Sequence, residues 1–170
     1  VAVDEGSERL RALERECEEA LGLGPVPLLK APGLAGPIAL GILRPAVLLP
    51  EAFAESHGDD AIRAALAHEL AHVKRRDFAA NLAHEAALVP FAWNPAAGLL
   101  RRRLDETREM ACDELAAARV LEPRRYARSL VTGAAGLKAP APALGVNDAD
   151  ILEEGLRHLL RPRSGRRRLA

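Results

Sequence analysis

The sequence lacks a long apolar run, although hydrophobic residues make up 49% of its 170 residues. A membrane-spanning helix needs roughly 18 or more consecutive apolar residues, and no stretch of this chain is that long. The nearest approach is 86–100, which Pro90, Asn94 and Pro95 interrupt. The sequence therefore predicts no transmembrane helix, and no signal-peptide pattern opens it. We expect this chain to be soluble.

Cysteine, aromatic residues and net charge are also scarce. Cys17 and Cys112 are too few for the disulfide framework of a small secreted protein, so a reducing compartment is the simpler expectation. Aromatic residues make up only 3% of the chain, so the core must rely on Leu, Ala and Val, which favours helix. The 24 basic and 24 acidic residues leave no net charge, which argues against a nucleic-acid-binding module built on the arginine clusters.

The apolar pattern predicts one mostly helical α+β domain over 1–170, with the basic stretch at about 161–170 as a flexible tail. Apolar residues at spacings of three and four, with start and stop signals, predict these helices: 4–21, 59–76, 78–89, 94–121, 123–137 and 148–160. Asn94 followed by Pro95 is typical of a helix start, and Asp59 or Asp60 can cap the second of these helices.

Two short apolar runs predict a small antiparallel sheet packed against these helices. The runs 38–43 and 46–49 flank Arg44-Pro45, which indicates a hairpin, and 26–30 can form a first strand. Because both runs are apolar on both faces, we expect helices to cover them. Nearby glycines and prolines favour an irregular edge strand, and such an edge can pair with an extended peptide. We therefore expect substrate contacts at Ile38, Ala39, Leu40 and Gly41.

The strongest functional signal is the stretch 66–72, which reads LAHELAH. His68 and His72 are four residues apart, so a helix places them on one face, where they can share a metal ion. Glu69 is next to the first histidine, where its carboxylate can reach a water on that metal. The pattern fixes only three positions, so a surface helix with two solvated histidines is the alternative. Apolar residues on both sides of the pattern favour partly buried histidines.

A catalytic zinc ion needs a third protein ligand. No further histidine follows His72 at short spacing, so this ligand must come from another helix. Glu109 is the expected ligand, and Asp113, one turn later, is expected to hydrogen-bond a ligand histidine. Cys112 is a rival ligand by its chemistry, although we expect a small core residue there. The other acidic residues of this segment are expected on a solvated helix face: Asp105, Glu106 and Glu114.

Several motifs, in this order, resemble the BlaR/MecR-type metallopeptidases, the membrane-embedded antirepressor proteases of the beta-lactam sensor-transducer family. These motifs are GILRPAVLLP at 41–50, HELAHVKRRD at 68–77, NPAAGLLRRR at 94–103, REMACDE at 108–114 and YARSL at 126–130. The resemblance covers about 25–137 and implies a gluzincin fold related to the Ste24/HtpX peptidases. Nothing in the chain resembles a penicillin-binding sensor domain.

This resemblance also implies roles for particular residues. Zinc would be bound by His68, His72 and Glu109, with Glu69 as the catalytic base. Asp113 would support one ligand histidine, most simply His68. In the family this domain faces the cytoplasm, between transmembrane helices of a bacterial inner membrane. The present chain lacks those helices and begins at valine, so we expect an excised catalytic domain.

The expected function is that of a zinc-dependent endopeptidase, and a transcriptional repressor is one candidate substrate. The alternative is a catalytically silent signalling or scaffold domain that zinc stabilises. A purely structural zinc site does not need Glu69, so the complete set of residues favours the enzyme.

Other residues allow weaker interpretations. The sequence does not choose an oxyanion-stabilising residue among its candidates: Arg125, Tyr126, Arg157 and His158. His57, in a Ser-His-Gly loop, is expected to be exposed to solvent. His84 is expected to be structural rather than a metal ligand.

Overall fold

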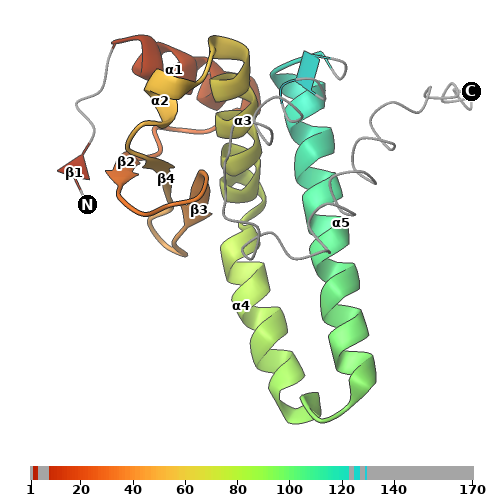
Figure 1. The fold of residues 1–170 in the computed structure, drawn as a ribbon. Helices are drawn as coiled ribbons and strands as arrows, with labels where there is room; N and C mark the ends of the chain where they lie inside the picture. Colours follow the sequence, from red (N-terminus) through yellow and green to blue (C-terminus); the bar gives the residue numbers. More distant parts are fainter. Residues whose placement is uncertain (1, 4–7, 123–124, 127–128, 130–170) are drawn as a thin grey trace, which may run out of the picture.

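The computed structural model describes residues 2–3, 8–122, 125–126 and 129 (Figure 1). Of the helix predicted at 123–137, only three residues are described, and all three are helical. The helix predicted at 148–160 and the basic tail lie outside the described residues. The extension of one domain to residue 170 therefore stays a prediction.

The described residues confirm a mostly helical α+β fold. The strands are β1 (Ala2–Val3), β2 (Leu28–Ala31), β3 (Ile38–Leu40) and β4 (Ala46–Pro50). The helices are α1 (Glu8–Leu21), α2 (Phe53–Ser56), α3 (Asp59–Arg75), α4 (Asp77–Leu88), the short 3-10 turn η1 (Val89–Phe91) and α5 (Pro95–Arg119). Within these bounds, no helix is both long enough and apolar enough to cross a membrane.

The sheet is mixed, so the prediction of an antiparallel sheet was wrong in part. Its strand order is β1-β2-β4-β3. The hairpin between β3 and β4 is confirmed, with Ile38 opposite Leu48, but β2 and β4 are parallel. The chain reverses direction once before β3 and again before β4, so β4 runs parallel to β2. In the sheet, β4 lies between β2 and β3. Local turn signals predict only pairing between consecutive strands, which is why this parallel pair was missed.

Strand β3 forms one edge of the sheet, as expected, but helices cover only one of its faces, the one from which Ala39 packs against the core. Ile38 and Leu40 are 42% and 38% exposed, whereas Val47 and Leu49 of the central strand are each 1% exposed. The expectation that helices cover both runs is therefore wrong for β3. An exposed apolar edge leaves backbone groups free to pair with another chain.

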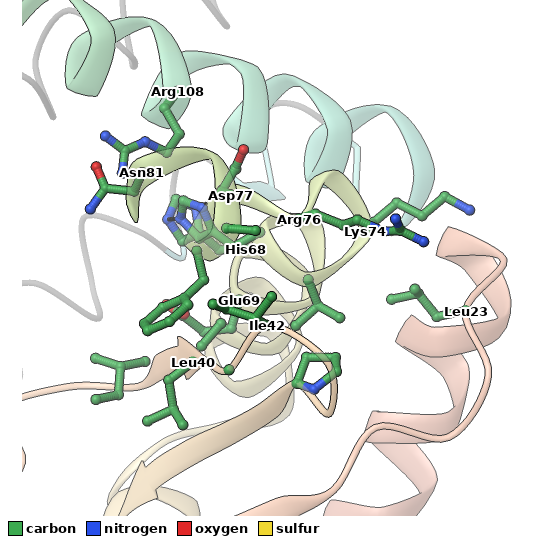
Figure 2. Close-up of a pocket in the computed structure, with 18 of the residues that line it drawn as sticks. Leu23, Leu40, Ile42, His68, Glu69, Lys74, Arg76, Asp77, Asn81 and Arg108 are labelled. Atoms are coloured by element: carbon green, nitrogen blue, oxygen red, sulfur yellow. Dashed lines mark hydrogen bonds and ion pairs between the residues drawn. The ribbon is translucent and has the colours of Figure 1, made fainter. Parts of the chain in front are cut away.

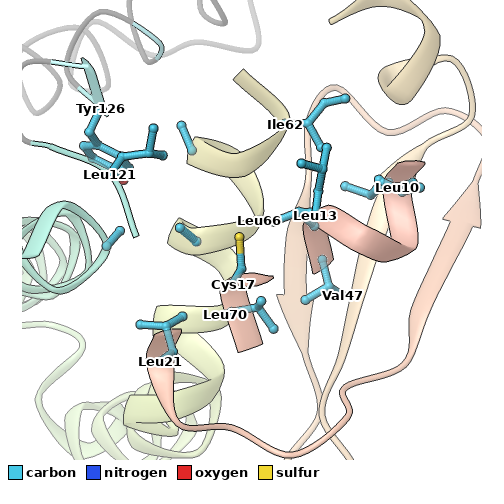
Figure 3. Close-up of a cluster of buried hydrophobic side chains, with 14 of the residues drawn as sticks. Leu10, Leu13, Cys17, Leu21, Val47, Ile62, Leu66, Leu70, Leu121 and Tyr126 are labelled. Carbon is cyan, nitrogen blue, oxygen red and sulfur yellow. The ribbon is translucent and has the colours of Figure 1, made fainter. Parts of the chain in front are cut away.

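Helix α3 is the centre of the core and packs against α1, α5 and the β3–β4 hairpin. Its apolar stripe meets the stripe of α1, and Figure 3 shows Leu13 and Cys17 of α1 facing Leu66 and Leu70. All four of these side chains are 3% exposed or less. At about 1.5–3 kcal/mol for each large side chain removed from water, this packing holds in place the helix that carries His68 and His72.

Helices α3, α4 and α5 are joined by two sharp turns. Arg76, with φ of 57°, ends α3 and starts α4. Asn94 caps α5 as predicted, because its side-chain oxygen accepts a hydrogen bond from the Ala96 amide at 2.9 Å. Gly58 occupies the cap position of α3 instead of Asp59 or Asp60, which fall in the first turn, where acidic residues suit the helix dipole. Figure 1 shows α4 and the first half of α5 extending as a hairpin away from the sheet.

Candidate metal centre

Helix α3 presents two imidazole rings to the same point in space. His68 and His72 are one turn apart, and their Nε2 atoms are 3.2 Å from each other. The rings meet edge to face, with an interplanar angle of 80°. Both side chains are mostly buried, with 19% and 16% exposed. The alternative of two solvated histidines on a surface helix is therefore excluded.

Helix α5 supplies the third polar group. Glu109 Oε2 lies 3.2 Å from His68 Nε2 and 3.7 Å from His72 Nε2. Donors about 2.0–2.1 Å from a tetrahedral zinc ion are separated from one another by about 3.3–3.4 Å. The three separations scatter closely around this value, so the donor set fits zinc in both chemistry and spacing.

His68, His72 and Glu109 form a trio whose pKa values follow from burial and from the hydrogen bonds of these side chains. Burial by itself lowers the pKa of His68, but hydrogen bonds with Asp113 and Glu109 outweigh it and raise that pKa to about 10. Burial would raise the pKa of Glu109, yet its hydrogen bonds with both histidines hold this pKa well below its usual value. Glu109 is therefore a carboxylate at neutral pH, the state in which it can bind a cation.

Each histidine uses its second nitrogen to contact a buried carboxylate. His68 Nδ1 lies 2.9 Å from Asp113 Oδ1, and this oxygen also accepts a hydrogen bond of 2.8 Å from the Tyr126 hydroxyl. His72 Nδ1 lies 3.0 Å from Asp77 Oδ2. Such contacts fix the orientation of a ligand histidine and leave Nε2 as the nitrogen facing the metal.

The sequence reasoning missed Asp77 as a supporting residue, and it named Tyr126 as an oxyanion candidate and not as a partner of Asp113. Asp77 is only five residues after His72, which in a continuous helix would place it on a different face. The left-handed conformation of Arg76 turns the chain and brings Asp77 back against the histidine. Tyr126 is fully buried and approaches from a segment that is distant along the chain. The aspartate that closes the HELAHVKRRD stretch was the available signal for Asp77, and the YARSL stretch at 126–130 was the available signal for Tyr126.

Cys112 lies behind His72 and does not face the other two donors. Its Sγ donates a hydrogen bond of 3.1 Å to Asp77 Oδ2 and lies 3.3 Å from His72 Nδ1. An ion could also be held by a second group of neighbouring residues: Cys112, Asp77 and His72. Such an ion would take His72 Nδ1, the nitrogen that already contacts the Asp77 carboxylate. The geometry favours Glu109 over Cys112 as the third ligand, and the prediction of a buried core cysteine is confirmed.

Glu69 lies beside the trio in a pocket of about 810 Å³. The pocket is also lined by the four residues expected to contact substrate, Ile38 to Gly41, so the expected metal ligands, the expected base and the expected substrate contacts all border this one cavity. Figure 2 shows Leu40 of β3 and Ile42 of the bend that follows it beside Glu69. Burial raises the pKa of Glu69, while the two histidines and a backbone hydrogen bond from Ala39 act in the opposite direction.

Comparison with known proteins agrees with this geometry. The sequence profile of the BlaR1 peptidase M56 family matches residues 4–151. The chain belongs to the BlaR1 peptidase M56 family. The M56 chain is 28% identical to the regulatory protein BlaR1 of Bacillus licheniformis over 108 residues, which is 63% of this chain and 18% of that protein. It is 30% identical to the methicillin resistance mecR1 protein of Staphylococcus aureus over 77 residues, 45% of this chain and 13% of the relative. The aligned part therefore spans less than a fifth of either relative.

The other predicted residues of this M56 domain occupy different places. Arg125 forms an ion pair with Asp60 at 2.9 Å, and Tyr126 is buried behind Asp113, so neither borders the pocket. The remaining oxyanion candidates, Arg157 and His158, lie outside the described residues. Two polar residues that the sequence analysis did not single out, Asn81 and Arg108, do line the pocket.

Three minor expectations need correction. His57 is half-buried and stacks on Phe53, with ring centroids 4.3 Å apart, so it is not a solvent-exposed loop residue. His84 is exposed, so the structure gives it no buried structural role. Glu106, expected to be solvated, is instead ion-paired with two arginines of α5 and is only 19% exposed, whereas Glu114 is exposed.

Proposed function

We propose that this M56 domain is a zinc-dependent endopeptidase of the gluzincin type. The observation that carries the proposal is the convergence of His68, His72 and Glu109 at zinc-ligand spacing, with Glu69 beside them in an open pocket. A site that served only to hold a structural metal would be closed and would not need a further carboxylate.

The roles of the residues follow from their positions. His68, His72 and Glu109 would hold the ion, which, when bound, polarises the scissile carbonyl and makes water more acidic. Glu69 would take a proton from the attacking water and pass it to the leaving amine. Its raised pKa, a consequence of burial, brings it closer to the pH at which it must both accept and donate a proton.

The edge strand β3 would hold the substrate in an extended conformation. Its outer edge has no neighbouring strand in the described sheet, and it lines the same pocket as Glu69. Backbone pairing along 38–41 would place a peptide beside the metal with little dependence on sequence, while the exposed side chains of Ile38 and Leu40 would favour apolar residues.

The biological setting is proposed from the relatives. They are named as regulatory and methicillin resistance proteins and are much longer than this chain. From the family resemblance we propose that the domain belongs to a longer parent protein, lies at the cytoplasmic face of a bacterial membrane and has a transcriptional repressor as its substrate.

The decisive experiment compares Glu69→Gln and Glu69→Ala with the unaltered chain. Both variants are expected to retain zinc, since Glu69 is not in the trio, and to lose cleavage of a library of extended peptides followed by mass spectrometry. Glu51→Gln, at an exposed position in a turn, is the matched control and should cleave normally. Cleavage at the unaltered rate by Glu69→Gln would refute the catalytic assignment.

The same assay addresses the alternative function. If the unaltered chain binds zinc stoichiometrically and cleaves no member of the library or candidate repressor, the silent signalling domain is the better reading. The presence of Glu69 in the pocket, next to a free strand edge, is the observation that favours the enzyme.

A further inference from the structure

The hairpin formed by α4 and α5 ends in an exposed apolar tip, residues 86–100. Within this hairpin tip the following large side chains are exposed: Val89, Phe91, Trp93, Leu99 and Leu100. Trp93 alone is 82% exposed. Single exposed apolar residues are common, but a contiguous group of this size on a projecting element marks a contact surface. Figure 1 shows that the tip is the part of the hairpin farthest from the sheet.

The hairpin tip contains no charged residue, and several of its polar groups are satisfied within the tip itself. The Trp93 indole nitrogen donates to the Pro90 carbonyl at 3.1 Å, and the Asn94 side chain caps α5. The Asn94 amide donates to the Phe91 carbonyl at 2.8 Å. Pro90 and Pro95 have no amide hydrogen to satisfy. An apolar medium requires polar groups to be paired in this way, because a polar group left unpaired there costs several kcal/mol.

A band of arginines begins where the tip ends. Arg101 forms two hydrogen bonds of 2.7 Å with Glu85 and so joins α5 to α4. Arg102 and Arg103 are paired with Glu106, and the Arg103 side chain remains 72% exposed. The arginines thus neutralise the acidic residues nearest the tip and leave one positive charge in excess.

We propose that the hairpin tip inserts into the interfacial layer of a phospholipid bilayer that carries anionic headgroups. At 1.5 Å per residue, the arginine band lies about 9–12 Å along α5 from Pro95. This matches the roughly 5–10 Å by which an apolar surface enters the boundary between headgroups and acyl chains. Tryptophan and arginine are the residues favoured at that depth. The contact goes beyond the peptidase activity and does not depend on it.

Trp93 is the one tryptophan of the chain, so its fluorescence reports on the surroundings of the hairpin tip. The zinc-loaded chain is mixed with vesicles of phosphatidylcholine alone, or of phosphatidylcholine and phosphatidylglycerol in equal parts. We expect the Trp93 emission to move to shorter wavelength, to be quenched by lipids brominated in their acyl chains, and to do so more strongly with the anionic vesicles.

Variants separate insertion from surface attraction. Phe91→Ser and Leu99→Ser should each weaken partitioning into vesicles about tenfold or more, and Arg103→Gln about fivefold with anionic vesicles only. Leu43→Ser is the matched control, because this side chain is 93% exposed but lies outside the hairpin, and it should partition normally. Zinc content and far-ultraviolet circular dichroism check that each variant is folded.

Four results would overturn the proposal. An unchanged emission with both vesicles would exclude insertion, and sedimentation with vesicles at unchanged emission would reduce the contact to charge attraction. A shift that appears without lipid as protein concentration rises would assign the tip to a second copy of the chain. Emission already at short wavelength in dilute, lipid-free protein would show that another part of this chain covers it.

Discussion

Replacement of Asp113 tests whether the carboxylate behind His68 supports metal binding. Its Oδ1 contacts His68 Nδ1 at 2.9 Å and the Tyr126 hydroxyl at 2.8 Å, and the residue is 8% exposed. Asp113→Asn keeps an acceptor of the same shape but removes the charge. Asp113→Leu removes the acceptor as well.

The expected magnitude follows from these two contacts. Loss of a carboxylate that orients a ligand histidine weakens metal binding about 10- to 100-fold. We place Asp113→Asn at the lower end and Asp113→Leu at the upper end, which corresponds to about 1.4–2.8 kcal/mol. In Asp113→Leu the Tyr126 hydroxyl also loses its 2.8 Å hydrogen bond and keeps only the 3.2 Å contact with His68 Nδ1, and loss of such a buried hydrogen bond costs about 1 kcal/mol of folding stability.

The double variant Asp113→Leu/Tyr126→Phe separates the two effects. Removal of both polar partners should recover much of the lost free energy of unfolding, because the buried hydroxyl that lost its carboxylate partner is then absent. Zinc affinity should not recover, because His68 still lacks its carboxylate. Zinc affinity is measured by competition with a chromogenic chelator, and stability by urea unfolding of the chelator-treated protein.

Two results would refute this reasoning. Zinc affinity within twofold of the unaltered chain in Asp113→Leu would show that Asp113 does not support the metal site. Recovery of zinc affinity together with stability would show that Asp113 acts only through the fold.

Three further predictions concern the trio and the strand edge. Glu109→Ala should reduce zinc content to a small fraction of one ion per chain by metal analysis, and full occupancy would instead implicate Cys112. In the metal-free protein the raised pKa of His68, about 10 against 6.5 in the unfolded chain, stabilises the fold at low pH. The free energy of unfolding should therefore fall as pH rises between these values, and a flat urea-unfolding profile would contradict the assignment. Gly41→Ala, at φ of 101° with a Cβ 2.7 Å from the Arg44 carbonyl oxygen, should cost about 1–3 kcal/mol. Gly24→Ala has open space around its Cβ, so it should be close to neutral, and equal unfolding midpoints for the two variants would refute the strain.

Features encoded by local spacing could be predicted from the sequence. The spacing of His68 and His72 places both on one face of any helix, and Asn94-Pro95 marks a helix start through a cap that needs no distant partner. The segment around Glu109 was also identified from its acidic residues. The geometry inside each of these segments is determined within one or two helical turns, whereas the approach of Glu109 to the two histidines depends on the packing of α5 against α3.

Features that depend on distant contacts or on one unusual backbone angle could not be predicted. The parallel pairing of β2 with β4 joins segments separated by an intervening strand. The exposure of β3 depends on where the helices pack and not on its own apolar pattern. The contact of Asp77 with His72 requires Arg76 to be left-handed, a conformation more usual for Gly or Asn and not signalled by arginine.

The left-handed turn at Arg76 has a mechanical consequence. It sets the angle between α3 and α4, and it also sets the position of the Asp77 carboxylate against His72. A tilt of the α4–α5 hairpin relative to α3 therefore cannot occur without displacing the group that orients one of the two histidines. Helix α4 is about 18 Å long, so we expect a contact made at the hairpin tip to alter the position of Asp77 at its other end and, with it, the orientation of His72.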